Sequence, residues 1–428
     1  MRVLFALNPE KTIFQYMVTT AWALRTAGHE VHVASQPWFA DTITQAGLTA
    51  VPVGGNRDPW RITAHRPDLL AQMRVGHFKP YDAFDDPTKA TWEYLRPGIA
   101  RAAAGFHRVA NFPIIAELVE YARHWRPDLV VWDALSYAGS IAAQSCGAAH
   151  ARLLFGVDVY GGVRQLYRQL NAAQPEDERA DPIADWFAGY GRRYGFDFTE
   201  DLFTGHFTID QLPRSLQVEA DLEYVRTRYV PYGGPAVVPR WLFRPPERPR
   251  IGLTMGVSAT EIFRGYAISM ADVLAALADL DVEVVATVAA DQQAGLGALS
   301  ANVRLVSYVP WHALVPSCSV VVNHAGAATL ATTALYPVPQ LALHHHADQP
   351  ILGRLLAEQG AGLELPTTLA TGESVRAAVL RLLGEPTFGL RAAALTAEIE
   401  ALPTPNEIVP RLEELTVKHR AGTVTAGG

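Results

Sequence analysis

The stretch RVLFALNPEKTIFQYMVTTAWALRTAGHEVHVASQPWFADTITQAGLTAVPV, residues 2–53, carries the pattern that decides the fold. Residues 3–7 form a short apolar run, typical of a strand buried on both faces of a parallel sheet. Residues 15–27 have helical spacing and are followed by Gly28, where a left-handed helix cap is expected. The remaining elements are a strand at 31–34, a helix at 41–46 and a second strand at 50–53. Together they predict one half of a doubly wound α/β sheet.

The same alternation of strands and helices returns in the second half of the chain. Strands are expected at 250–255, 282–287, 303–306, 320–323 and 340–343, and helices at 271–280, 328–335 and 350–359. Proline and glycine are dense just before this half, which is typical of a linker. We therefore expect an α/β protein with two Rossmann-like domains that face a central cleft. The predicted N-terminal domain covers 1–232, a linker 233–250 and the C-terminal domain 251–404. A C-terminal helix at 405–420 and a disordered tail at 421–428 follow.

The regular pattern is interrupted within the first half, at about 57–110. This segment mixes aromatic residues with prolines and charges and contains no clear strand, so it is interpreted as an irregular or helical insertion on the domain rim. Such positions often carry binding surfaces. Regular elements then resume, with helices at 114–125 and 137–146 and strands at 129–132 and 152–155.

Composition excludes several classes of protein. The chain has 428 residues, a net charge of −7, 49% hydrophobic and 18% charged residues, which argues against disorder and against a broad nucleic-acid surface. Its two cysteines are too few for a disulfide framework or a cysteine metal site. The N-terminus lacks the features of a secretion signal, so a cytoplasmic protein is expected.

One stretch, residues 305–347, contains no Asp, Glu, Lys or Arg. A membrane span needs about 20 apolar residues, but Pro310, Pro316, Pro337 and Pro339 interrupt this stretch too often for one. We expect no membrane segment here. The missing charges need a different explanation.

Three strand ends in the second half carry groups that suit a charged or hydroxylated ligand. The first strand runs into Gly256 and Ser258, and the fifth runs into three histidines followed by Asp348 and Gln349. The fourth runs into small residues and then a helix, whose free N–H groups and dipole attract phosphate. Ligands bind open α/β sheets at the carboxyl ends of strands, so these turns predict a binding site. Tight packing of the helix on the strand is the alternative explanation for the small residues.

These turns form part of a longer resemblance. NVRLVSYVPWHALVPSCSVVVNHAGAAT at 302–329, followed by Asp348-Gln349, resembles the donor-site signature of inverting, nucleotide-sugar-dependent glycosyltransferases of the B fold (GT-B). WALRTAGHEVHVASQPWFADTITQAGLTAVPVG at 22–54 and RYVPYGGPAVVPRWL at 228–242 are similar to the macrolide- and anthracycline-type antibiotic glycosyltransferases of actinomycetes. The resemblance covers essentially the whole chain. It implies the GT-B fold and transfer of a deoxysugar with inversion.

The resemblance implies a donor site in the second half and an acceptor site in the first. His324 would lie against the diphosphate, Tyr308 and Val309 would hold a thymine base, and Asp348 with Gln349 would face the hexose. The other implied donor residues are Gly256, Ser258, Gly326, Ala327 and Thr329. The implied acceptor residues, which suit a large apolar aglycone, are Ile13, Phe14, Phe78, Phe84 and Phe155. A helix dipole and His324 would take the place of a divalent cation, so no metal and no cofactor beyond the TDP-sugar co-substrate are expected.

The chain departs from the family pattern in two places. The family motif His-His-Gly-Gly-Ala-Gly-Thr corresponds here to Asn-His-Ala-Gly-Ala-Ala-Thr, which adds methyl groups at Ala325 and Ala328. The histidine that deprotonates the acceptor in the family is replaced by Ile13. A general base needs hydrogen-bond reach to the acceptor, and Asp133 is the first substitute, with Glu10 the second. The alternatives are that Asp133 is a turn or cap residue and that Glu10 is a solvated loop charge.

The histidine triplet at 344–346 is interpreted as ordinary loop residues, because adjacent side chains at a strand end point to different sides. The main hypothesis is transfer of a TDP-deoxysugar to a polyketide-type aglycone. A catalytically silent homologue that acts as a helper or binding subunit, and an unusual acceptor that needs little base, are the alternatives. The resemblance also implies a possible P450-like auxiliary protein on the N-terminal domain, and a homodimer is possible. No nucleic acid or membrane partner is expected.

Overall fold

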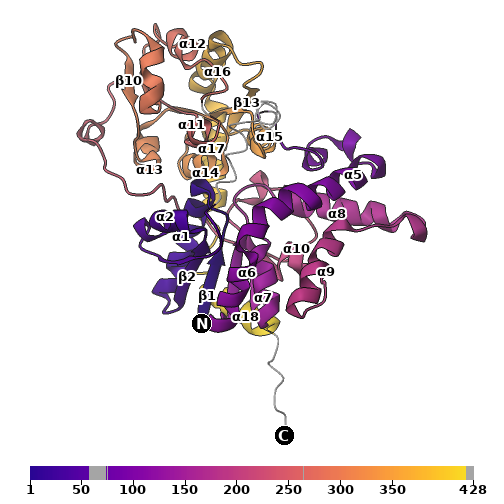
Figure 1. Ribbon diagram of the computed structural model, residues 1–428. Coiled ribbons are helices and arrows are strands. Elements are labelled where there is room, and N and C mark those ends of the chain that lie inside the picture. Colours follow the sequence, from indigo (N-terminus) through magenta and orange to yellow (C-terminus); the bar gives the residue numbers. More distant parts are fainter. Residues whose placement is uncertain (57–73, 75, 264, 421–428) are drawn as a thin grey trace.

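The computed structural model describes residues 1–56, 74, 76–263 and 265–420. The predicted tail at 421–428 and much of the first part of the predicted insertion lie outside these described residues. The protein consists of two parallel β-sheets with helices packed around each, one in the first half of the chain and one in the second (Figure 1). This confirms the predicted fold class of two Rossmann-like domains.

The N-terminal sheet has the strand order β3-β2-β1-β4-β5-β6-β7, with all pairs parallel. Its strands are β1 Arg2–Ala6, β2 Glu30–Ser35, β3 Thr49–Pro52, β4 Leu129–Asp133, β5 Ala149–Leu153, β6 Phe207–Asp210 and β7 Tyr224–Arg226. Their helices are α1 Lys11–Thr26, α2 Ala40–Gln45, α5 Trp92–Ala102, α6 Arg108–Trp125, α7 Ala138–Cys146, α8 Val159–Ala172, α9 Pro182–Tyr194 and α10 Asp201–Thr204. The order reverses next to β1, so the loops after β1 and β4 lie at the switch point where ligands bind.

The C-terminal sheet has the strand order β10-β9-β8-β11-β12-β13, again with all pairs parallel. Its strands are β8 Arg250–Thr254, β9 Glu283–Thr287, β10 Val303–Val306, β11 Val320–Asn323, β12 Gln340–His344 and β13 Gly362–Pro366. The helices are α11 Ser258–Glu261, α12 Met270–Ala276, α13 Trp311–Leu314, α14 Ala327–Ala334, α15 Gln349–Gln359, α16 Gly372–Gly384 and α17 Pro386–Glu400. Here β8 and β11 flank the switch point.

Some strands differ from the expectation. The strand predicted at 152–155 is β5, which begins three residues and ends two residues earlier, and β6, β7 and β13 were not predicted. In β5, His150 and Arg152 are both fully buried, so the strand has no continuous apolar run for the sequence pattern to reveal. Arg152 tolerates burial because its guanidinium pairs with Asp158 at 2.5 Å.

The last helix, α18 Val409–His419, returns to the N-terminal domain. Figure 1 shows it beside α7, far from the other helices of the second half. Leu412 and Leu415 are buried in the core cluster that contains the N-terminal sheet, and α18 contacts β5. Glu413 lies 2.9 Å from Nε2 of His29, and Arg420 forms an ion pair with Asp128 at 2.6 Å.

The chain therefore passes between the domains twice, and the two passages touch. Pro403, between α17 and α18, accepts hydrogen bonds from the Arg228 N–H at 2.7 Å and from the Thr227 hydroxyl at 3.0 Å. Thr227 and Arg228 follow β7 and begin the connection to β8. Among the described residues, no helix combines the length and apolar character needed to cross a membrane.

Candidate active site

A cleft of about 430 Å³ lies between the carboxyl ends of the two sheets. Its walls are the loops after β1, β4 and β5 on one side and after β8, β11 and β12 on the other. The predicted site residues that line it are Glu10, Ile13, Phe78, Phe155, Gly256, Ser258, Tyr308, Val309, His324, Gly326, Ala327, Thr329, Asp348 and Gln349. Asp133, Phe14 and Phe84 are not part of this lining.

His324 stands at the centre of the C-terminal wall. Its imidazole fills the space where side chains of Gly256 and Gly326 would be: a Cβ would come within 2.5 Å of its Cε1 at Gly256 and within 2.3 Å of its Nε2 at Gly326. Burial lowers the pKa of His324 to about 4, so the ring is neutral at pH 7. The close approach of the ring thus explains Gly326, whereas Gly256 also takes a left-handed φ of 73° that favours glycine.

The turn after His324 leads directly into α14. Gly326 is the N-cap residue and makes no side-chain cap, and the first-turn residues Ala327 and Thr329 line the cleft. The first N–H groups of a helix have no partner within the helix, so this end of α14 can bind an anion. Ala325, one of the two added methyl positions, takes a left-handed φ of 60°, a conformation that usually belongs to glycine.

Asn323, which stands where the family motif has its first histidine, supports this turn from below. Its Oδ1 accepts the Ala325 N–H at 2.7 Å, and its Nδ2 donates to Gln340 at 2.8 Å. Both side chains are buried. The sequence pattern gave no signal for this role of Gln340, because the residue lies inside β12.

Tyr308 and Val309 form one end of the C-terminal wall. Val309 is buried, whereas Tyr308 is 48% exposed and its hydroxyl donates to the Gly233 carbonyl at 3.3 Å. An exposed aromatic face at the cleft margin suits stacking of a base. Trp311, also in the cleft wall, is fixed by a 3.0 Å hydrogen bond from its indole N–H to Thr333.

Asp348 and Gln349 occupy the opposite end of this wall and are already engaged by backbone groups. Gln349 Oε1 accepts the N–H groups of His345 and His346 at 3.2 and 3.0 Å. Asp348 Oδ2 accepts the N–H of Val157, a residue of the other domain, at 2.9 Å. Burial raises the pKa of Asp348 to about 6.

Glu10 and Asp133, the two candidate bases, have different surroundings. Glu10 lines the cleft, accepts the Thr12 hydroxyl at 2.7 Å, and has a pKa raised to about 7, chiefly by burial, with a smaller effect of the Asp133 charge. Asp133 is fully buried and accepts the N–H groups of Asn8 and Leu135, at 3.1 and 2.9 Å, and the hydroxyl of Ser136. Burial raises its pKa to about 6. Asp133 thus holds the two loops together, and Glu10 faces the cleft.

The N-terminal wall is otherwise mainly apolar. Ile13, Phe78 and Phe155 line it together with Phe106 and Tyr160. The two other predicted acceptor residues lie elsewhere: Phe14 packs edge-on against Phe39 with ring centroids 5.7 Å apart, and Phe84 packs against Gly162 of α8.

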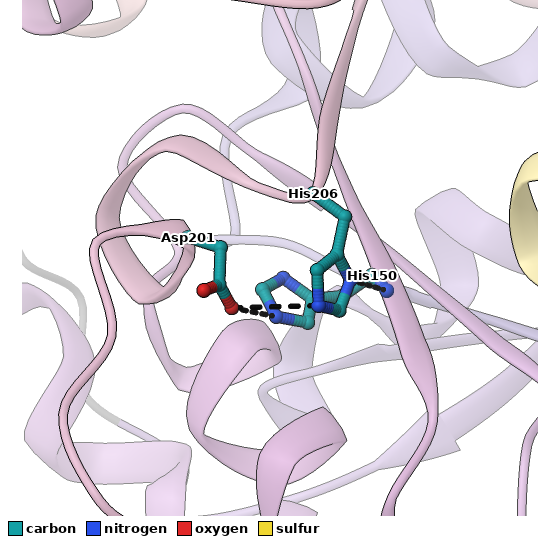
Figure 2. A group of neighbouring side chains, drawn as sticks. All are labelled: His150, Asp201 and His206. Atoms are coloured by element: carbon teal, nitrogen blue, oxygen red, sulfur yellow. Dashed lines mark hydrogen bonds and ion pairs between the residues drawn. The ribbon is translucent and has the colours of Figure 1, made fainter. Parts of the chain in front are cut away.

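The histidine triplet does not converge. His344 Nε2 lies 3.0 Å from the carboxylate of Glu364 of β13, whereas the rings of His345 and His346 contact Phe263. A different group, His150, Asp201 and His206, brings its ligand atoms within 4.8 Å of one another (Figure 2).

The hydrogen bonds of this second group oppose metal binding. His206 Nδ1 accepts the backbone N–H of His150 at 3.1 Å, so the proton of its neutral ring resides on Nε2, the atom that faces Asp201 at 3.5 Å. A ligating nitrogen needs a free lone pair. The group is therefore a hydrogen-bonded cluster. The ring of His419 of α18 stacks on His206, so the cluster also anchors the last helix.

The comparisons with known proteins agree with this geometry. The family models described as Erythromycin biosynthesis protein CIII-like, N-terminal and C-terminal domain, match residues 22–256 and 271–415. The chain is 46% identical to the 10-deoxymethynolide desosaminyltransferase of Streptomyces venezuelae (98% of each chain) and 42% identical to the tylactone mycaminosyltransferase of Streptomyces fradiae (99% of this chain, 94% of the relative). 

Solved structures give the same result. The glycosyltransferase VinC in complex with dTDP superposes with a TM-score of 0.87 at 38% identity, over 98% of this chain and 100% of VinC. The spinosyn forosaminyltransferase SpnP gives 0.81 at 37%, over 97% and 99%. The two-domain architecture is thus that of GT-B enzymes. The chain belongs to the Erythromycin biosynthesis protein CIII-like family and is a glycosyltransferase.

Proposed function

We propose that the chain transfers a deoxyhexose from a TDP-sugar to a hydroxyl group of an apolar, polyketide-type aglycone, with inversion at the anomeric carbon. The observation that carries the proposal is the division of the cleft. Its C-terminal wall presents a helix N-terminus and a neutral imidazole, and its N-terminal wall presents aromatic side chains with one carboxylate, Glu10, of raised pKa.

The donor side suits a diphosphate without a metal ion. The charge-free stretch 305–347 runs through this wall, so no carboxylate within it repels the donor phosphates. The N–H groups at the start of α14 and the ring of His324 stabilise the charge that develops on TDP as it leaves. The structural neighbour VinC was solved in complex with dTDP, which supports the choice of nucleotide.

The acceptor side supplies the base. The acceptor oxygen attacks the anomeric carbon from the face opposite TDP, the carbon–oxygen bond to the diphosphate breaks, and the hydroxyl proton passes to the carboxylate of Glu10. A pKa of about 7 suits this transfer, because a base works best when its pKa lies near the operating pH. Asp133 supports Glu10 in two ways. Its hydrogen bond from the Asn8 N–H fixes the loop after β1, and its charge raises the pKa of Glu10.

The test follows TDP release from a TDP-deoxysugar with a panel of macrolide and anthracycline aglycones. Glu10→Gln should lower kcat by about 10²- to 10⁴-fold with unchanged TDP binding, because general-base catalysis contributes that much. The matched control is Glu120→Gln, which alters an exposed carboxylate of α6 outside the cleft lining. Full activity of Glu10→Gln would exclude Glu10 as the base. TDP binding by the wild type without any turnover would favour the helper-subunit alternative.

We also propose a P450-like auxiliary protein on the N-terminal domain, which the sequence resemblance implies, and a homodimer. Turnover by the purified chain is expected to rise when such an auxiliary protein is added. Full activity of the isolated chain would contradict the auxiliary. A monomer in size-exclusion chromatography would contradict the dimer.

A further inference from the structure

We propose that the acceptor domain completes the hexose subsite: the backbone N–H of Val157 holds the carboxylate of Asp348 across the cleft, and Gly156 provides the space for it. The proposal rests on the proposed function, because it concerns how the donor sugar is recognised. Gly156 and Val157 are therefore positioning residues for the Asp348 carboxylate.

The contact between the two walls is close and depends on a glycine. Asp348 Oδ2 lies 2.9 Å from the Val157 nitrogen, and a Cβ at Gly156 would come within 1.9 Å of the same oxygen. No alanine methyl fits there unless the carboxylate moves. A backbone N–H that meets a charged oxygen makes a stronger hydrogen bond than a neutral pair.

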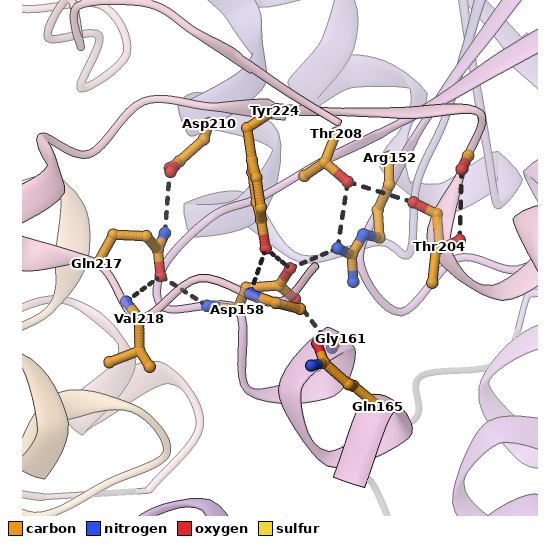
Figure 3. Close-up of polar contacts among 12 residues, drawn as sticks. Arg152, Asp158, Gly161, Gln165, Thr204, Thr208, Asp210, Gln217, Val218 and Tyr224 are labelled. Carbon is orange, nitrogen blue, oxygen red and sulfur yellow. Dashed lines mark hydrogen bonds and ion pairs between the residues drawn. The ribbon is translucent and has the colours of Figure 1, made fainter. Parts of the chain in front are cut away.

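The loop that carries Val157 is fixed from behind by buried polar groups (Figure 3). Gln217 bridges it: its Oε1 accepts the Asp158 N–H at 2.9 Å, and its Nε2 donates to the Gly156 carbonyl at 3.3 Å. Asp158 in turn accepts from Arg152 at 2.5 Å and from the Tyr224 hydroxyl at 2.7 Å. The Val157 N–H is thus already oriented, so its hydrogen bond with Asp348 costs little conformational entropy of the loop.

The carboxylate can serve both partners at once. Each of its oxygens has two lone pairs, so a carboxylate that accepts the Val157 N–H can still accept a sugar hydroxyl. Asp348 lines the cleft, where that hydroxyl would be. Without the Val157 contact the side chain would no longer be held in one orientation. Hexose recognition should therefore depend on the other domain, whereas recognition of the nucleotide, which uses α14 and Tyr308, should not.

The experiment measures binding of TDP and of TDP-glucose by calorimetry, in the absence of any acceptor. Gly156→Ala should weaken TDP-glucose binding by about tenfold, the effect of losing one hydrogen bond to a charged group, and leave the TDP affinity unchanged. In an Asp348→Ala background, Gly156→Ala should have no further effect, because the partner of the contact is already missing. Gly55→Ala, which adds a methyl in open space, is the control.

Gln217→Ala provides a second variant that leaves the cleft lining intact, and the same selective loss of TDP-glucose affinity is expected from it. Equal losses of TDP and TDP-glucose affinity, or additive effects of Gly156→Ala and Asp348→Ala, would overturn the inference while the proposed function stands. A wild-type chain that binds no TDP would overturn both.

Discussion

The absence of a side chain at Gly326 leaves room for the imidazole ring of His324 in the donor wall of the cleft. Gly326 has an ordinary φ of −65°, so a side chain would meet no backbone strain there. It would meet His324 instead, at 2.3 Å from Nε2. The position is glycine because of the ring.

We predict that Gly326→Ala displaces the imidazole and weakens TDP binding by about tenfold or more, the effect of losing a hydrogen-bonding partner of a charged ligand. Calorimetry with TDP measures this change. Gly389→Ala is the control, because Gly389 lies in α17 with open space around it. An unaltered TDP affinity in Gly326→Ala would remove His324 from the donor site.

The pH dependence of turnover follows from Glu10. A carboxylate acts as a base only when it is ionised, and burial raises the pKa of Glu10 to about 7. We therefore expect kcat/KM to rise as the pH increases from 6 to 8. This rise of kcat/KM with pH should disappear in Glu10→Gln. A rise that persists in that variant would assign the titration to another group.

At the scale of single elements, the cluster around His206 links α18 to β5 and β6. Burial and the neighbouring His150 lower the pKa of His206 to about 3, below its usual 6.5. As the pH falls below 6.5, the unfolded chain binds a proton here before the native protein does. Stability that is present above pH 6.5 is thus lost as the pH falls toward 3.

We predict that the free energy of unfolding falls with acidification by up to about 1.4 kcal/mol per pH unit from this one group. His206→Gln should flatten the dependence between pH 6.5 and 5 in urea titrations. His124→Gln, at an exposed position of α6, should leave the slope as it is. A slope that His206→Gln does not change would show that the cluster is not the source.

The elements that sequence patterns predict well are those with uniform burial. β1 and β11 are continuous apolar runs, and α1 is followed by Gly28, so their types and the turns after them follow from spacing alone. The start of β5 was missed because it contains the polar His150, which is fully buried and interrupts the apolar pattern.

The site was predictable to the same extent and for the same reason. Residues directly after strands, such as His324, line the cleft because all parallel strands end at one edge. Ile13 and Phe14 are neighbours on α1, and each helical residue turns the side chain by about 100°, so only one of them faces the cleft. The contact between Val157 and Asp348 joins two domains, and no local pattern encodes it.

For the molecule as a whole, the contact of Pro403 with Thr227 and Arg228 brings the two interdomain passages together at one place. Two covalent connections that meet at one point can form a hinge between the domains. We therefore expect rotation about this point to be the main relative motion of the two domains.

We predict that the connection between β7 and β8 is not needed to hold the folded domains together, because α18 also joins them. Val237 is 84% exposed, so a protease site inserted beside it should be cut without disturbing the core. The two fragments should still co-elute in size-exclusion chromatography, because α18 remains packed on the N-terminal sheet. Fragments that separate would contradict this. The enzyme could then be produced as two separate fragments that are held together by α18.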